Sequence, residues 1–287
     1  MPFAVRASFE WQLRTRALSL GPRTLVMGIL NVTPDSFSDG GQYLDTNAGL
    51  KHALEMLESG ADILDLGGES TRPNAVPITS AEEQARVLPV LRAILKERPQ
   101  AIVSIDTYHA ETARLAVEAG AEIVNDVSGH LWDPRMSVTC AALACGAILM
   151  HTRGRPQEWR TLPPLAPAEV LPLVLRDLET RANAALAAGI ARDAIVLDPG
   201  FGFGKAFDEN YPLLAHLDRL HVLGFPILAG LSRKSFLTRA VPPESEPQLP
   251  TTVANTAAIL AGAHILRVHD VGPARVAADV ADRILAA

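Results

Sequence analysis

Eight short apolar runs, rich in β-branched residues, recur along the chain, and most are followed by a segment with helical periodicity. The runs cover residues 25–30, 63–66, 102–105, 123–124, 147–150, 195–197, 226–229 and 264–268. Short apolar runs separated by helices are typical of buried parallel strands. Eight strand–helix alternations within about 250 residues predict a (β/α)8 TIM barrel, an α/β fold. A doubly wound sheet is the main alternative, because periodicity alone does not exclude it.

Capping and proline signals mark the helices and loops between these runs. Residues 80–83 form a capping box that is expected to open a helix, and Pro89 is expected to kink that helix. The proline-rich stretch 242–250 is expected to form an exposed loop before a helix that begins near Thr251. No linker or compositional break divides the chain, so we expect a single domain over residues 1–287, with an N-terminal extension before the first strand.

Composition and charge narrow the class of protein. The 287 residues carry 26 Lys and Arg against 32 Asp and Glu, and the net charge of −6 argues against a broad nucleic-acid surface. A hydrophobic fraction of 48% excludes wholesale disorder. No apolar run approaches the roughly 18 residues of a membrane span, and the N-terminus lacks a signal-peptide core. The two cysteines, Cys140 and Cys145, exclude a disulfide scaffold and are expected in the core, so we expect a soluble cytoplasmic protein.

Polar side chains stand at the ends of nearly all the apolar runs. They include Asn31, Asp106, Asn125, Asp126, His151, Asp198, Lys234, Arg267 and His269. In a barrel, the carboxyl ends of the strands converge on one mouth, where active sites lie. Asp106, Asn125 and Asp198 could each be a helix cap. Their coincidence with Lys234 and Arg267 favours a shared ligand instead, because buried polar groups need partners.

Several other polar residues have a simpler structural interpretation. Helix caps or turns are the preferred roles of Asp126, Ser128 and Asp270. Asp65 lies in the middle of its run and is expected to be a structural acceptor beneath the site. His151 is expected to be a hydrogen-bonded core histidine rather than a ligand contact.

Two further features indicate what kind of ligand would bind. The glycine-rich segment 198–205 fits neither the P-loop nor the dinucleotide-binding pattern, so nucleotide binding is not supported. Phe201 is expected in the core, whereas Phe203 could offer its face to a flat substrate. Arg267 and His269 are two residues apart on one strand, so they point to the same face and suit an anion.

On these motifs the sequence resembles the dihydropteroate synthases. The matching segments, in chain order, are MGILNVTPDSFSDGG (27–41), GGESTRP (67–73), DPGFGFGK (198–205), SRKS (232–235) and RVHD (267–270). The resemblance runs through nearly the whole chain and implies a (β/α)8 barrel with long mobile loops after the first two strands. It also implies condensation of 6-hydroxymethyl-7,8-dihydropterin diphosphate with 4-aminobenzoate, which gives 7,8-dihydropteroate and diphosphate in folate biosynthesis.

The resemblance assigns roles to the residues at matching positions. The pterin pocket that it implies comprises Asp106, Asn125, Met150, Asp198, Lys234 and Arg267. The diphosphate would be held by Asn31, Arg267 and His269, and Mg²⁺ by the diphosphate together with Asn31. The 4-aminobenzoate site would comprise Thr71, Arg72, Phe203 and Ser235. Catalysis would involve Asp35, in the mobile loop after the first strand, together with Lys234, Arg267 and His269.

The chemistry of the implied substrates suits these residue types. A carboxylate such as Asp198 can accept two adjacent N–H donors of the pterin at once. Lys234 can donate to the ring acceptors, and Arg267 can stack on the ring while its charge meets phosphate oxygens. Because the pterin methylene cation is resonance-stabilised, we expect diphosphate to leave before the neutral arylamine attacks, without a covalent enzyme intermediate.

Three other functions stay open. A pterin-binding barrel that transfers a methyl group from a methylfolate to a corrinoid protein would have no need for Lys234 or for the pair Arg267 and His269. An inactive paralogue of the synthase is the second alternative, and a pterin-binding or interaction module is the third. Formation of dihydropteroate, and competition by sulfonamides that mimic 4-aminobenzoate, would separate these functions.

Further features concern surfaces beyond the matched motifs. The segment 150–156, with Arg153 and Arg155, is more basic than the family pattern, and His130 stands where a small residue is expected. The stretch 251–262 is apolar nearly all round, which is typical of a helix buried on more than one side. The resemblance implies a homodimer through the last helices, with tight packing inside one chain as the alternative.

Overall fold

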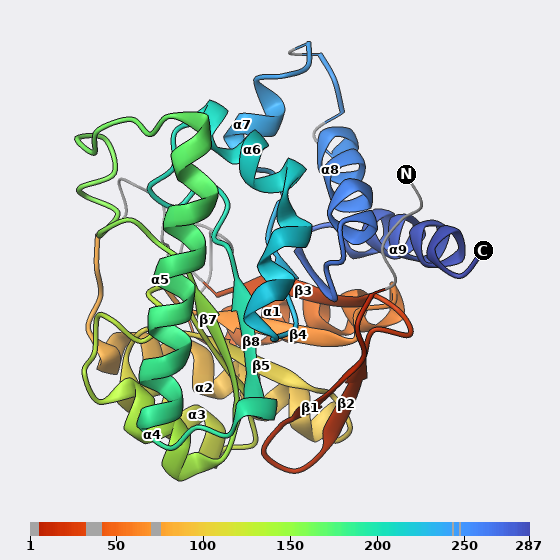
Figure 1. Cartoon of the computed structure of the whole chain (residues 1–287). Coiled ribbons are helices and arrows are strands. Elements are labelled where there is room, and N and C mark those ends of the chain that lie inside the picture. Colours follow the sequence, from red (N-terminus) through yellow and green to blue (C-terminus); the bar gives the residue numbers. More distant parts are fainter. Residues whose placement is uncertain (1–5, 33–41, 70–75, 243, 247) are drawn as a thin grey trace.

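The computed structural model describes residues 6–32, 42–69, 76–242, 244–246 and 248–287 (Figure 1). Its central element is a sheet of eight parallel strands. These are β3 (Leu25–Asn31), β4 (Ile63–Gly67), β5 (Val103–Asp106), β6 (Ile123–Asp126), β7 (Gly146–Met150), β8 (Ile195–Asp198), β9 (Leu228–Ala229) and β10 (Ile265–Val268). Each of the eight predicted apolar runs falls on one of these strands. The loops predicted to be mobile, after β3 and β4, contain residues 33–41 and 70–75, which lie outside the described part.

The sheet closes on itself. Hydrogen-bonded neighbours follow the order β8-β7-β6-β5-β4-β3-β10-β9, and every pair in this sheet is parallel. An isolated parallel bridge between Leu197 and Ile227 joins β8 to the chain just before β9, and the Leu197 N–H donates to the Pro226 carbonyl over 3.0 Å. The predicted (β/α)8 barrel is therefore confirmed, and the doubly wound alternative is wrong.

Helices cover the outside of the barrel (Figure 1). The α-helices are α1 (Gln42–Glu58), α2 (Ser80–Glu97), α3 (Ala110–Glu118), α4 (Met136–Leu143), α5 (Pro167–Ala187), α6 (Asn210–Ala215), α7 (Ser235–Thr238), α8 (Gln248–Leu260) and α9 (Val271–Leu285). Short 3₁₀ segments are η2 (Arg192–Ala194), η3 (Phe207–Glu209) and η4 (Leu217–Leu223). Because the strands are buried on both faces, their sequences are continuous apolar runs rather than alternating ones.

A hairpin that the sequence pattern did not predict covers the amino end of the barrel. It pairs β1 (Phe9–Gln12) with β2 (Ala17–Leu20) in antiparallel register within the predicted N-terminal extension. The Trp11 side chain is almost fully buried, and its Nε1 donates to the Ala194 carbonyl over 2.9 Å. Trp11 packs in one cluster with residues inside the barrel, including Met27 and Ile148. The hairpin therefore plugs the barrel at the end opposite the strand carboxyl termini.

Two local predictions differ from the structure by a few residues. The capping box of α2 begins at Thr79 rather than Ser80: Oγ1 of Thr79 accepts from the Glu82 N–H over 3.3 Å, and Oε2 of Glu82 accepts from the Thr79 N–H over 2.8 Å. The helix α8 begins at Gln248, and Pro250 is buried in its first turn, where a missing N–H costs nothing. The loop predicted over 242–250 therefore ends earlier than expected.

None of the helices in the described ranges combines the length and the hydrophobicity that a membrane span requires.

Candidate active site

Strand register brings three predicted polar residues and one glycine, from four neighbouring strands, into one row. Asn31 lies opposite Gly67, Gly67 opposite Asp106, and Asp106 opposite Asn125, at the carboxyl ends of β3 to β6. A Cβ on Gly67 would lie 3.6 Å from the Asn31 amide oxygen and 3.7 Å from Oδ2 of Asp106. The absence of a side chain at Gly67 therefore leaves Asn31 and Asp106 facing the same space.

Arg267 on β10 joins this row to a buried carboxylate below it. Nε of Arg267 donates to Oδ2 of Asp65 over 2.6 Å, and Nη2 donates to Oδ2 of Asp106 over 2.5 Å. The same Asp65 oxygen accepts from the Asn125 amide over 2.9 Å. Asp65 is fully buried, as its mid-strand position predicted, and it is a structural acceptor for two neighbouring site residues. The other Asp65 oxygen is buried without a hydrogen-bond partner among the described residues.

Asp198 and Lys234 face the same region from β8 and from the start of α7. Asp198 is 4% exposed and lies opposite Met150 on β7. Its Oδ1 accepts from the Gly200 N–H over 2.7 Å. Nζ of Lys234 lies 4.1 Å from the centre of the Phe203 ring, a cation–π contact. The cluster therefore combines an acid, a cation and an aromatic face at one mouth of the barrel.

Burial and neighbouring charge shift the pKa values of these groups toward neutrality. Burial raises the pKa of Asp106 to about 7, although the Arg267 cation opposes this shift. Burial also raises the pKa of Asp198, against the backbone hydrogen bond from Gly200 and the charge of Lys234. Burial, helped by Arg267, lowers the pKa of Lys234 to about 8, while Asp198 and Asp106 act in the other direction. Perturbed pKa values of this kind concentrate at functional sites.

The pair predicted to bind an anion also lies at this mouth. His269 follows β10, and both its backbone N–H and its Nδ1 lie within hydrogen-bond distance of Oγ of Ser232, at 3.1 and 3.0 Å. Burial, followed by the charges of Arg233 and Arg267, lowers the pKa of His269 to about 4. At neutral pH His269 is therefore an uncharged hydrogen-bonding group, and Arg267 carries the positive charge of the pair.

The arylamine residues predicted by the resemblance are only partly described. Phe203 is half-buried, and Ser235 is exposed at the first position of α7, a helix of 4 residues. Asp35, Thr71 and Arg72 lie outside the described residues. The prediction that Phe201 belongs to the core is confirmed, since it is fully buried and stacks on Phe236.

The structural roles predicted for other polar residues hold in most cases. The carboxylate of Asp126 accepts from the N–H groups of Ser128 and His130, and Oγ of Ser128 accepts from the next turn, so both are turn residues. Asp270 occupies the N-cap position of α9 but does not cap it. Its carboxylate instead pairs with Arg233 at 2.7 Å, so the predicted N-cap position is confirmed, although the side chain makes no capping hydrogen bond.

His151, Cys140 and Cys145 were predicted to lie in the core. His151 is buried, and its Nε2 lies 3.3 Å from Oδ2 of Asp177, but Nδ1 has no partner among the described residues. The prediction of a hydrogen-bonded core histidine is therefore confirmed for one of the two ring nitrogens of His151. Cys140 and Cys145 are both free and buried, as predicted.

Sequence reasoning missed one residue that shapes the site. Lys205 is buried, and its Nζ donates to the carbonyl oxygens of Gly200 and Phe203 over 2.7 and 3.4 Å. Burial pushes the pKa of Lys205 well below its ordinary value. Its position as the last residue of the glycine-rich segment was the available signal. Lys205 therefore links the backbone of this loop at Gly200 to its backbone at Phe203.

The comparisons with known proteins place this barrel in the class of pterin-binding enzymes. A family model described as "Pterin binding enzyme" matches residues 27–269. The dihydropteroate synthase of Clostridium beijerinckii is 42% identical over 262 residues, which cover 91% of this chain and 94% of the relative.

Two solved structures are also similar to this chain. The dihydropteroate synthase of Xanthomonas albilineans with 4-aminobenzoic acid has a TM-score of 0.88 at 40% identity, and the match covers 98% of this chain and 100% of that one. The Yersinia pestis dihydropteroate synthase with a sulfonamide drug has a TM-score of 0.87 at 38% identity, covering 97% and 100%. The chain therefore belongs to the pterin binding enzymes and, within them, to the dihydropteroate synthases, which are transferases of folate biosynthesis.

Proposed function

We propose that the protein condenses 6-hydroxymethyl-7,8-dihydropterin diphosphate with 4-aminobenzoate to form 7,8-dihydropteroate and diphosphate. The observation that carries this proposal is the convergence of Asp106, Asn125, Asp198, Lys234 and Arg267 on one mouth of the barrel. Acid, amide and cation are the groups needed to bind a flat heterocycle that has both donors and acceptors on its edges. The family to which the chain belongs supports the same reaction.

Recognition of the pterin would rest on the most deeply buried groups. Asp198 would accept the two neighbouring N–H donors of the pyrimidine edge, and the Gly200 N–H fixes its carboxylate in place. Asn125 is oriented by Asp65 and would pair with the mixed edge of the ring. Lys234, whose pKa is lowered to about 8, would donate to ring acceptors. Met150 lies opposite Asp198 in the strand register and would pack near the pterin.

Departure of diphosphate would be assisted from the β10 side. Arg267 is held by Asp65 and Asp106, so its guanidinium is already oriented before the leaving group gains charge. The uncharged His269 would donate a hydrogen bond to the departing oxygens. Because a resonance-stabilised pterin cation forms, no nucleophilic side chain is required. Exclusion of water from the site and alignment of the arylamine would then provide much of the acceleration.

A metal ion would act on the same side of the site. Members of the family use a metal ion in catalysis, and we propose Mg²⁺ for this chain. The described residues contain no group of three or more His, Cys, Asp or Glu side chains that could hold a metal. An amide oxygen such as that of Asn31 still fits Mg²⁺, which commonly uses one or two protein oxygens together with substrate phosphates and water. When bound, the ion would neutralise charge on the diphosphate.

The arylamine would bind outside the pterin, next to Phe203 and Ser235. The related Xanthomonas albilineans enzyme was solved with 4-aminobenzoic acid and the Yersinia pestis enzyme with a sulfonamide drug. We propose that both classes of molecule bind here in the same subsite, which would also include Thr71 and Arg72, with Asp35 acting near the reacting centre. The ring of Phe203 offers an aromatic face for a flat aniline.

One assay tests the proposed reaction. Purified protein is incubated with the dihydropterin diphosphate, 4-aminobenzoate and Mg²⁺, and dihydropteroate and diphosphate are quantified by chromatography. The proposal predicts both products in equal amounts, inhibition by a sulfonamide, and loss of turnover with EDTA that added Mg²⁺ restores. No dihydropteroate from folded protein would refute it. Methyl transfer from a methylfolate to a corrinoid protein would favour the alternative barrel.

We propose that the protein is a homodimer through α8 and α9, which pack against each other in Figure 1. These helices carry large apolar side chains that are exposed in the single chain: Leu249, Val253, Val276, Val280 and Ile284. Exposed apolar patches of this kind mark interaction surfaces. Sedimentation of the wild-type protein should give twice the mass of one chain, and Val253→Glu together with Val280→Glu should give monomers.

We also propose the cytoplasm as the location of the protein. Cys140 and Cys145 are both free and buried, which fits a reducing compartment.

A further inference from the structure

The loop after β7 lies directly across the glycine-rich loop after β8. The backbone N–H of Arg153 donates to the Phe203 carbonyl over 3.4 Å, and Nη1 of Arg153 donates to the Gly204 carbonyl over 3.0 Å. Gly204 has a φ of 67°, and a Cβ there would come within 2.6 Å of the Arg153 carbonyl oxygen. The two loops are therefore in such close contact that only glycine fits at this position.

Trp159, from the same loop after β7, packs against the ring of Phe203. The ring centres are 5.2 Å apart and the planes cross at 81°, which is the edge-to-face arrangement that aromatic pairs prefer. The Phe203 ring also carries Nζ of Lys234 at 4.1 Å from its centre. Phe203 thus connects Trp159 with the cation of the candidate active site.

The backbone around Phe203 does not by itself fix the plane of its ring. Gly202 and Gly204 flank it, with φ angles of 81° and 67°, and no helix or strand includes it. Lys205 donates to the Phe203 carbonyl over 3.4 Å, which fixes the backbone and not the plane of the ring. The orientation of the ring therefore depends on the side chains that pack on it, Trp159 and Lys234.

Trp159 is well placed to provide this support because it is itself fixed. Its Nε1 donates to the Gly154 carbonyl over 3.4 Å, and the side chain is half-buried. The turn that precedes it is closed by Glu158, whose carboxylate accepts from the Arg155 N–H over 2.6 Å. The loop that follows β7 is thus folded by its own hydrogen bonds and presents the indole of Trp159 to Phe203.

We propose that Trp159 is a positioning residue for the arylamine subsite. It orients the Phe203 ring, and it thereby sets the affinity for flat arylamines without touching the pterin pocket. This inference rests on the proposed function, because only there does Phe203 border the arylamine.

Steady-state kinetics with each substrate varied in turn tests the inference. Trp159→Ala should raise KM for 4-aminobenzoate about threefold to tenfold, the range expected for loss of one aromatic pair. The KM for the dihydropterin diphosphate and kcat should stay within about twofold of wild type, because Trp159 acts through the Phe203 ring and not directly on the pterin or the leaving group. Trp159→Phe keeps an aromatic edge and should behave like wild type, whereas Trp159→Leu should behave like Trp159→Ala.

Trp132→Ala is the matched control, because Trp132 packs on Tyr108 and lies 5.0 Å below the Arg155 guanidinium of the same loop, but is not paired with the Phe203 ring. It should leave the 4-aminobenzoate KM unchanged. Melting temperatures of all variants report whether each is folded. In a Phe203→Ala background, Trp159→Ala should have no further effect on the 4-aminobenzoate KM, because the ring on which it acts is gone.

The outcomes separate this inference from the proposed function. If wild-type protein makes dihydropteroate but Trp159→Ala and Trp159→Leu have unchanged KM values, the positioning role is refuted. Additive effects of Trp159→Ala and Phe203→Ala would refute it as well, since Trp159 would then act elsewhere. If folded wild-type protein makes no dihydropteroate, the proposed function itself fails, and this inference fails with it.

Discussion

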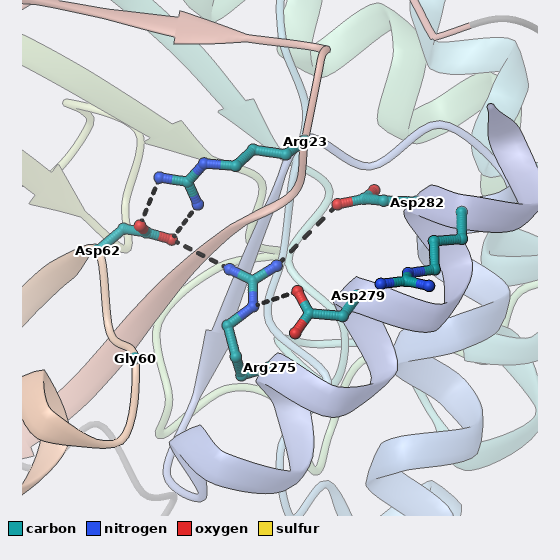
Figure 2. Close-up of a pocket in the computed structure, with 7 residues that line it drawn as sticks. Arg23, Gly60, Asp62, Arg275, Asp279 and Asp282 are labelled. Atoms are coloured by element: carbon teal, nitrogen blue, oxygen red, sulfur yellow. Dashed lines mark hydrogen bonds and ion pairs between the residues drawn. The ribbon is translucent and has the colours of Figure 1, made fainter.

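The two ends of the barrel use the same kinds of charged side chain, but they differ in how these are paired. At the amino end, a pocket of about 540 Å³ is lined by Arg23, Gly60, Asp62, Arg275, Asp279, Asp282 and Arg283. Figure 2 shows Arg275 between three acids, with Nε 2.9 Å from Asp279, Nη1 3.4 Å from Asp62 and Nη2 4.0 Å from Asp282. Each acid in this pocket therefore has a cationic partner.

These pairs connect distant parts of the chain. Arg23 binds both oxygens of Asp62 over 2.7 and 3.0 Å, which ties the start of β3 to the start of β4. Asp282 on α9 accepts from Arg6 over 2.8 Å and from the Thr24 N–H over 2.7 Å. The amino end is therefore a structural junction, in which the charges already satisfy one another.

At the carboxyl end the pairing is incomplete. Arg267 is bound by Asp65 and Asp106, but Lys234 packs on an aromatic ring, and neither it nor Asp198 forms an ion pair among the described residues. Buried charges without partners lower stability, and native proteins retain them mainly where a ligand completes them. The two ends therefore differ in the state of pairing of their charges rather than in the number of charges, and the incompletely paired end is the one proposed to bind a ligand.

The largest expected effect follows removal of the acid that is proposed to bind the pterin edge. Asp198→Ala should lower kcat/KM for dihydropteroate formation by about a thousandfold or more, because the donors of the buried pterin edge lose their acceptor. Steady-state kinetics measures this. Asp198→Asn, which keeps the shape and one acceptor oxygen, is the matched control and should lose less. Ordinary turnover by folded Asp198→Ala would contradict the pterin assignment.

Loss of the central cation should affect both activity and stability. Arg267→Ala should lower kcat by about a hundredfold, since it removes charge stabilisation of the departing diphosphate. It should also lower the free energy of unfolding by roughly 3 kcal/mol, because Asp65 and Asp106 would be left buried without their cation. Kinetics and urea denaturation measure the two effects. Arg267→Lys keeps the positive charge but loses the two parallel N–H donors of the guanidinium, and it is the matched control. An Arg267→Ala protein with the activity and stability of wild type would contradict the proposed role.

The pH profile should show both perturbed groups. The rate constant kcat/KM should rise as Asp106, with a pKa of about 7, ionises, and fall as Lys234, with a pKa of about 8, loses its proton. The fall should reach about tenfold by pH 9. Lys234→Arg should remove the alkaline limb, because a guanidinium stays protonated. A flat profile in wild type between about pH 5 and 9 would show that neither titration matters.

The smallest expected effect lies at the amino end. Arg275→Met should lower the free energy of unfolding by about 1–2 kcal/mol, since Asp62, Asp279 and Asp282 lose a shared, largely buried partner, while kcat/KM stays unchanged. Thermal and urea denaturation measure the change. Arg283→Met, in the same pocket and on the same helix, should change neither. A loss of activity in Arg275→Met would mean that the two ends are coupled.

The sequence predicted the barrel because its strands are buried on both faces. Each strand is therefore a continuous apolar run, which can be recognised from a few consecutive residues of the sequence. The hairpin of β1 and β2 escaped prediction because its position depends on a contact between Trp11 and Ala194, which are 183 residues apart in the sequence. The capping box was misplaced by one residue because Thr79 and Ser80 are both good caps, and each has a glutamate three residues later.

The site was predictable in part for the same reason. Strand ends converge in any barrel, so polar residues at those ends could be grouped without coordinates. The bonds of Arg267 could not be predicted, because Asp65 and Asp106 are separated from it by 202 and 161 residues. The support of Phe203 by Trp159 was missed too, since it joins two loops whose contact depends on glycine backbone angles.

Calorimetric titration of pteroic acid, a pterin ligand, tests the central claim most directly, with wild type, Asp198→Asn and Arg275→Met measured side by side. The account predicts that wild type and Arg275→Met bind with equal affinity and that Asp198→Asn binds at least tenfold more weakly, about 1.4 kcal/mol or more. Equal affinity in all three proteins would contradict the claim that the incompletely paired end of the barrel holds the pterin.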